Sequence, residues 1–141
     1  MQATIFFKKT GTAQHTFSGT ALLGLYRIRQ LHPDVVADDH LVERALAVAR
    51  GSEFLEQNKT TALQLLAEDG HPEALNLARK ILNTESTLML RVSAIGVLGL
   101  KGQSVDEEKL QVFTKSPGYR LRHAAKVALR KRNAAKVALH N

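Results

Sequence analysis

The sequence contains no cysteine, which excludes disulfide bonds, cysteine-ligated zinc and thiol nucleophiles. Aromatic residues make up only 5% of its 141 residues, although 44% are hydrophobic. The core must therefore consist of small aliphatic side chains, which suits closely packed helices better than a β-sandwich. Long apolar runs are also missing. A membrane helix needs roughly 20 apolar residues, whereas the longest candidate run, 21–26, is followed at once by arginine. Apolar residues 5–7 precede two lysines, the reverse of a signal peptide, so we expect a soluble, cytoplasmic protein with no membrane partner.

Acidic residues are missing from one part of the chain. Residues 1–70 hold seven Lys or Arg and eight Asp or Glu, whereas residues 71–141 hold thirteen and five. The net charge of +7 therefore arises in the second half. From Ser116 onward there are seven basic residues and no acidic one. A partner could recognise this local excess of positive charge.

Apolar residues at helical spacing predict an all-α chain of seven helices with short breaks between them. The expected helices cover residues 19–31, 38 or 39 to 50, 52–68, 72–82, 87–100, 104–115, and 117 to at least 130. Asp38 or Asp39 is expected to cap the second helix, and Ser104 with Glu107 forms a capping box for the sixth. Ser116 and Pro117 are predicted as N-cap and first position of the last helix. Residues 1–18 are predicted to be a loop or docking arm, and residues 134–141 a basic extension that a continued helix would include.

A helical pair of about thirty residues recurs three times. At an offset of 31, Arg91 superposes on Arg122. The same offset superposes Ala94 on Ala125, and an offset of 32 in the other direction places Lys59 on Arg91. Such a fixed period is the signature of a repeat architecture, in which stacked units share one core.

These residues resemble the HEAT-like repeats, in particular the short phycocyanobilin-lyase type. That signature has a basic residue, a small residue three positions later, and a Leu-Gly near the helix end, here Leu98-Gly99. The resemblance covers about residues 39–133. It implies a repeat domain over 19–133, folded as a short right-handed α-solenoid of three helical hairpins, with 19–31 as a leading helix.

The resemblance also implies charged contacts between successive units. In this family an acid stands about six residues before the basic residue, and Glu53 and Glu85 occupy that place before Lys59 and Arg91. Together with Arg122, these four residues are the expected repeat ladder. The alternative interpretation is that Arg91 and Arg122 line a concave surface and meet a ligand.

Small residues are expected where the inner helices of the stack approach one another. Ala62, Ala94 and Ala125 recur at one position of the unit. Gly96 and Gly99 would allow the same close approach, at about 1 kcal/mol each in helix propensity.

No catalytic, metal or cofactor site is predicted. Six histidines are scattered along the chain without ligand spacing: His15, His32, His40, His71, His123 and His140. No phosphate-binding glycine motif occurs. The paired carboxylates Asp38 and Asp39 are better explained as helix-start residues that stabilise the helix dipole.

The basic last helix is the sharpest functional signal. Arg122, Lys126 and Arg130 are spaced four residues apart and form one stripe. We define the candidate basic set as this stripe and its neighbours: Arg120, Arg122, Lys126, Arg130, Lys131, Arg132 and Lys136. Such a stripe could bind nucleic-acid phosphates. The alternative is a solvated helix whose polar outer face caps the stack.

The sequence therefore predicts a non-enzymatic scaffold. Its expected function is recognition of a protein partner through the inner helices 53–68, 87–101 and 117–132. Nucleic-acid binding through the basic last helix is the alternative, and a lyase-like or enzyme-accessory role by fold analogy is a distant third. An open apolar end of the stack would also permit self-association.

Overall fold

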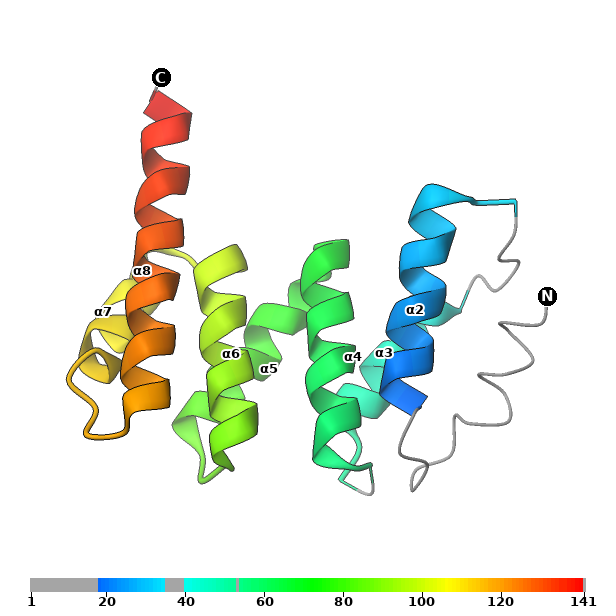
Figure 1. Ribbon diagram of the computed structural model, residues 1–141, viewed down its shortest axis with the longest axis horizontal. Helices are drawn as coiled ribbons and strands as arrows, with labels where there is room; N and C mark the ends of the chain where they lie inside the picture. Colours follow the sequence, from blue (N-terminus) through cyan, green and yellow to red (C-terminus); the bar gives the residue numbers. More distant parts are fainter. Residues whose placement is uncertain (1–17, 35–39, 53, 141) are drawn as a thin grey trace. The chain divides into compact units, whose positions relative to one another are not determined.

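A computed structural model describes residues 18–34, 40–52 and 54–140. These residues form helices without any strand, which confirms the all-α prediction for this part of the chain. Residues 1–17, Asp38, Asp39 and Glu53 lie outside the described residues. The helices are α2 (Ser18–Leu31), α3 (Leu41–Arg50), α4 (Glu56–Asp69), α5 (Pro72–Asn83), α6 (Leu88–Lys101), α7 (Ser104–Phe113) and α8 (Tyr119–His140) (Figure 1).

The helices form two compact units, one ending at Glu73 and the other beginning at Ala74. The boundary between the units lies within the region 19–133 that the sequence predicts as one repeat domain. The boundary lies near the start of α5, so this helix belongs almost wholly to the second unit.

The first unit packs α2, α3 and α4 around an aliphatic core. Leu22, Leu41 and Leu63 are almost completely buried. Asn58 on α4 is only 1% exposed, and its Oδ1 accepts a hydrogen bond of 3.0 Å from the backbone N–H of Gly19. This bond satisfies an N–H in the first turn of α2, where the helix itself offers no acceptor.

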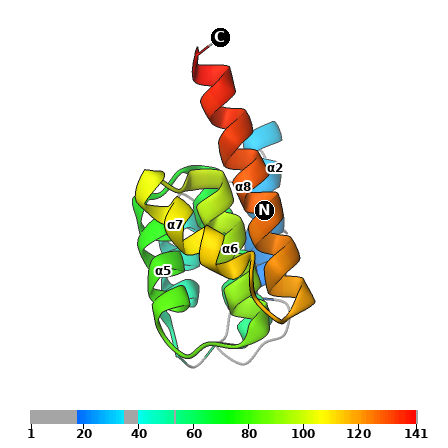
Figure 2. The same ribbon diagram turned by 90° about the vertical axis from the view of Figure 1, so that its left-hand side faces the viewer.

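The second unit consists of α5, α6, α7 and α8. Ala94, Leu98, Leu110 and Ala125 are nearly inaccessible to solvent and form its core. α6 and α8 lie side by side and run in the same direction, and α7 packs against both (Figures 1 and 2). Sequence spacing does not reveal how far the last helix continues. α8 extends to His140, and its residues from 133 to 139 are exposed.

Several predicted helix starts are wrong by a few residues. α4 begins at Glu56 instead of residue 52, and α8 begins at Tyr119 instead of residue 117. The Ser116 hydroxyl accepts a bond from the Gly118 N–H, which forms a turn before α8.

The capping box of α7 is also displaced by one residue. It joins Gln103 and Asp106 rather than Ser104 and Glu107, because Asp106 Oδ2 accepts a 2.7 Å bond from the Gln103 N–H. A guanidinium from another helix fixes Asp106 in this position, as described below. Spacing within α7 alone could not distinguish the two registers.

Two glycines of α6 have opposite environments. A Cβ at Gly99 would lie 2.8 Å from both Cα and Cβ of Ala128 on α8, so this glycine is required for the close packing of the two helices. A Cβ at Gly96 would meet no atom within 4 Å. The expectation that both glycines serve helix packing is correct for Gly99 and wrong for Gly96, which faces outward.

This difference predicts opposite effects for one substitution. Gly99→Ala forces α6 and α8 apart and should lower the unfolding free energy by about 1–3 kcal/mol. Gly96→Ala should instead raise it by about 0.5–1 kcal/mol, because alanine favours the helix and meets nothing. Denaturant titration of the two variants checks this. Equal effects of the same sign would show that the contact at Ala128 does not limit the packing.

Candidate functional site

The repeat offset of 31 residues identifies equivalent positions on α6 and α8. The two helices are in parallel register, since Gly99 lies beside Ala128 and the Gly102 carbonyl accepts a bond from Arg132. Equivalent positions on parallel neighbouring helices face the same side. One such set is half-buried or exposed on both helices, and we term it the front face: Met89, Ser93, Gly96 and Leu100 on α6, with Arg120, Ala124, Val127 and Lys131 on α8.

The front face combines apolar, small and basic side chains. Met89 and Leu100 are 49% and 54% exposed and stand at its two ends on α6. Arg120 and Lys131 occupy the equivalent ends on α8 and are exposed. Between the ends are only short side chains or none. The middle of the face is therefore lower than its ends, and it bears no charge.

The predicted stripe of Arg122, Lys126 and Arg130 lies on another side of α8. Lys126 and Arg130 are exposed and correspond to Ile95 and Gly99 on α6. Ile95 is fully buried and Gly99 is in contact with α8. The stripe thus places charge where α6 packs against its neighbour, which is the arrangement expected for a solvated cap.

Arg122 is held by its own surroundings. Its guanidinium donates to the carbonyls of Ser116 and Pro117, at 2.9 and 3.3 Å, and lies 5.7 Å from the centre of the Tyr119 ring. The His123 ring stacks on the same tyrosine, with 5.6 Å between ring centres. Arg122 therefore orders the turn before α8 and is a weaker candidate for ligand contact than its exposed neighbours.

Two members of the candidate basic set pair with an acid on α7. Arg132 donates to the Gly102 carbonyl and lies 3.0 Å from Glu107 on α7, and its side chain is only 11% exposed. Lys136 lies 2.5 Å from the same carboxylate. Hydrogen bonds from Lys136 and then Arg132 hold the pKa of Glu107 below its ordinary value. These two cations attach α8 to α7, and Arg132 is largely covered, whereas Lys136 stays partly exposed.

The expected repeat ladder is not where the described residues form their interhelical ion pairs. The Arg91 guanidinium lies over the Phe113 ring, 5.2 Å from its centre, and its buried Nε has no hydrogen-bond partner in the described part of the chain. Glu85 is exposed and Lys59 half-buried, and neither forms an ion pair with a described residue. Glu53 lies outside the described residues.

Ion pairs between helices occur instead at positions outside the repeat signature. Arg27 on α2 pairs with Glu68 on α4 at 2.9 Å, and the hydrogen bond from Arg27 lowers the pKa of Glu68. In the second unit, Arg79 on α5 binds Asp106 on α7 through two bonds of 2.8 and 2.9 Å. Asp106 is 5% exposed. Burial alone would raise its pKa, but bonds from Arg79 and the Gln103 N–H outweigh burial, so the pKa lies below its ordinary value.

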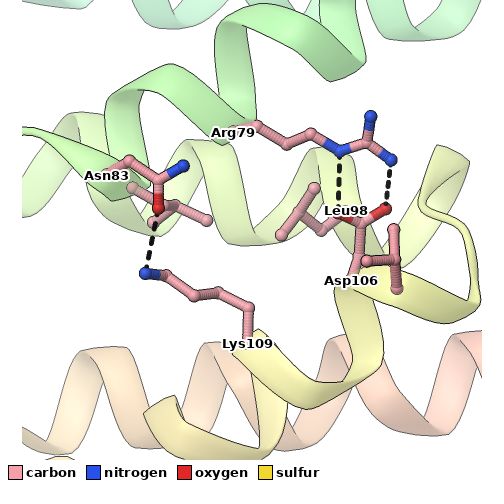
Figure 3. Close-up of a pocket in the computed structure, with 7 residues that line it drawn as sticks. Arg79, Asn83, Leu98, Asp106 and Lys109 are labelled. Atoms are coloured by element: carbon pink, nitrogen blue, oxygen red, sulfur yellow. Dashed lines mark hydrogen bonds and ion pairs between the residues drawn. The ribbon is translucent and has the colours of Figure 1, made fainter.

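The Arg79–Asp106 pair forms one side of a cavity of about 320 Å³ between α5, α6 and α7 (Figure 3). On the other side, Lys109 Nζ donates to Asn83 Oδ1 at 3.0 Å. The cavity is lined by Arg79, Leu82, Asn83, Leu98, Val105, Asp106 and Lys109. Its charged side chains are engaged between α5 and α7, Arg79 with Asp106 and Lys109 with Asn83, and its lining includes no histidine or serine. We therefore assign it a structural role.

The described histidines do not form a common site. His40 lies 3.0 Å from Glu43, His71 accepts a bond from the Glu73 N–H, and His123 stacks on a tyrosine. Among the residues that the structure describes, no three histidine, aspartate or glutamate side chains are grouped as metal ligands.

Comparison of the chain with protein-family models, curated proteins and solved structures finds no match in any of the three sets. Over the described ranges, every helix is too short or too polar to cross a membrane. The front face and the basic side chains of α8 are therefore the features on which a functional argument rests.

The division of the candidate basic set can be tested on neighbouring arginines. Arg132→Gln removes the bonds to Gly102 and Glu107 and should lower the Tm by roughly 4–8 °C. Arg130→Gln makes the same chemical change on the exposed side and should shift the Tm by less than about 2 °C. Thermal unfolding followed by circular dichroism measures both.

The pH dependence separates the contributions of the two partners of Arg132, Glu107 and the Gly102 carbonyl. Because the pKa of Glu107 is depressed in the folded protein, its contribution is complete above the unfolded pKa and is lost as the pH falls through the folded pKa. The Arg132→Gln deficit should therefore shrink in acid without vanishing, since the bond to the carbonyl remains. If Arg130→Gln lowered the Tm as much as Arg132→Gln, the assignment of a structural role to Arg132 alone would be contradicted.

Proposed function

We propose that the chain is a HEAT-like helical-repeat scaffold that binds a protein partner through its front face. The proposal extends the three helical pairs into a short right-handed solenoid, in which each pair buries apolar surface against the next. The parallel packing of α6 and α8 in a register near the repeat offset supports this arrangement. In this proposal the protein acts in the cytoplasm as a binding scaffold, without enzymatic activity and without a cofactor.

One observation carries the proposal. α6 and α8 expose apolar side chains, Met89 and Leu100, on the same face as two basic ones, Arg120 and Lys131. Protein interfaces combine an apolar centre with a polar rim and favour methionine and arginine. Exposed glycine in the middle of a helix is unfavourable for the isolated helix. A Cβ at Gly96 would meet no atom within 4 Å in the described structure, so we attribute the glycine to close approach of a partner.

Nucleic-acid binding is less well supported. Phosphates follow one another at about 3.4 Å along each strand of duplex DNA, so a surface that neutralises them needs closely spaced cations. Arg120 and Lys131 are separated by three turns of helix, and the residues between them on the front face are uncharged. The stripe of Lys126 and Arg130 is more closely spaced, but it occupies the positions of a cap.

Site-specific photocrosslinking tests the proposed function. A photoreactive amino acid is placed at Ser93 or Val127 on the front face, and at Val112 on α7 or Arg130 on the stripe as exposed controls. In extracts of the native cells, the two front-face positions should give the same protein adduct, and the controls should give at least about tenfold less. Gly96→Arg, which fills the middle of the face, should abolish the adduct.

Adducts at Val112 or Arg130 that match those at Ser93 would contradict recognition through the front face. Nuclease-sensitive adducts concentrated at Arg130 would support the nucleic-acid alternative instead. Folding of each variant is verified by circular dichroism, so that loss of an adduct is not confused with unfolding.

A further inference from the structure

The front face has charge at its ends and none at its centre. Arg120 and Lys131 are exposed, and neither forms an ion pair with any residue in the described ranges. No acidic side chain belongs to the face. Two uncompensated cations on one side of α8 favour a partner with carboxylates, because complementary charge steers encounter and fixes the orientation of binding.

The separation of the two cations sets the geometry of that partner. Arg120 and Lys131 are eleven residues apart on one continuous helix. At 1.5 Å per residue, their Cα atoms are about 16 Å apart along the axis. A partner helix lying along α8 has the same rise, so its two carboxylates must also be about eleven residues apart.

The centre of the face sets the chemistry between the two carboxylates. Ser93 and Gly96 on α6 are equivalent to Ala124 and Val127 on α8, and none of these side chains is charged or large. This low centre leaves room for bulky apolar side chains, while Met89 and Leu100 offer apolar contact at its ends. The shape fits a helix with large apolar residues in the middle and acidic residues on either side.

We infer that the front face binds an amphipathic helix of a protein partner, with large apolar side chains over Gly96 and a carboxylate at each of Arg120 and Lys131. This inference rests on the proposed function and specifies its partner. Binding of an amphipathic helix by its apolar face is an established mode of peptide recognition. The cap side of α8, with Lys126 and Arg130, takes no part in it.

Model peptides test this inference on the full chain. The first helical peptide carries leucines at its centre and two glutamates eleven residues apart. The second replaces both glutamates by glutamine, and the third places them four residues apart. Fluorescence anisotropy gives the affinities, and ¹⁵N–¹H NMR spectra locate the contact. The first peptide should bind about tenfold more tightly than the other two and shift resonances of the front face.

Charge reversal supplies matched controls. Arg120→Glu with Lys131→Glu should weaken the first peptide at least tenfold and create affinity for a peptide with lysines in place of its glutamates. The double variant Lys126→Glu with Arg130→Glu changes the net charge by the same amount on the cap side. Its affinity for the first peptide should stay within about twofold of that of the unchanged protein.

Each contrary outcome has a distinct meaning. Equal binding of the glutamate and glutamine peptides at the front face would overturn the acidic partner but leave the proposed protein-binding face standing. Equal loss in the two double variants would show that only net charge matters and would overturn the inference. If no peptide shifts the NMR resonances of the front face, the inference is overturned as well. The crosslinking experiment tests the proposed function independently of these peptides.

Discussion

The close contact of α6 with α8 at Gly99 and Ala128 determines the rest of the second unit. A side chain at residue 99 would meet the backbone of α8 at 2.8 Å, so the helices can approach this closely only because glycine is present. That contact sets the parallel register, and the register brings equivalent positions of the repeat onto one face. It also brings the carbonyl of Gly102 to Arg132, which then meets Glu107 and attaches α7. Packing, ion pairing and the proposed binding face therefore share one geometric origin.

Apart from Arg122, which orders the turn before α8, the basic side chains of α8 have three separate physical roles. Arg132 and Lys136 compensate Glu107 and attach α8 to α7. Lys126 and Arg130 cover the side on which the equivalent residues of α6 are buried, where charge opposes packing of a further helix. Arg120 and Lys131 remain on the face beside apolar residues. All charged residues of α8 are basic, but only two of these cations lie next to the surface proposed to bind a protein partner.

Helix periodicity was sufficient to predict the helices of the described residues, with some starts wrong by a few residues, because it is a local signal. Ala62, Ala94 and Ala125, which recur in the sequence, are fully buried. The role of Gly99 followed from the same reasoning. The division of the basic set did not follow, because the partner of Arg132 is an acid on α7, 25 residues earlier. The displaced capping box had a similar cause, since Arg79 on α5 binds Asp106. Gly96 was misassigned because the presence of glycine alone does not show which side of α6 packs against α8.

Binding of labelled duplex and single-stranded DNA and RNA, followed by fluorescence anisotropy between low and physiological salt, tests the central claim most directly. If α8 uses its charge for attachment, capping and recognition of carboxylates, nucleic-acid binding should be weak at low salt and absent at physiological salt. Reversal of Lys126 and Arg130 to glutamate should then have little effect on the measured nucleic-acid affinity. Tight binding at physiological salt, with a steep salt dependence that this reversal abolishes, would contradict the account and make the cap side of α8 the working site.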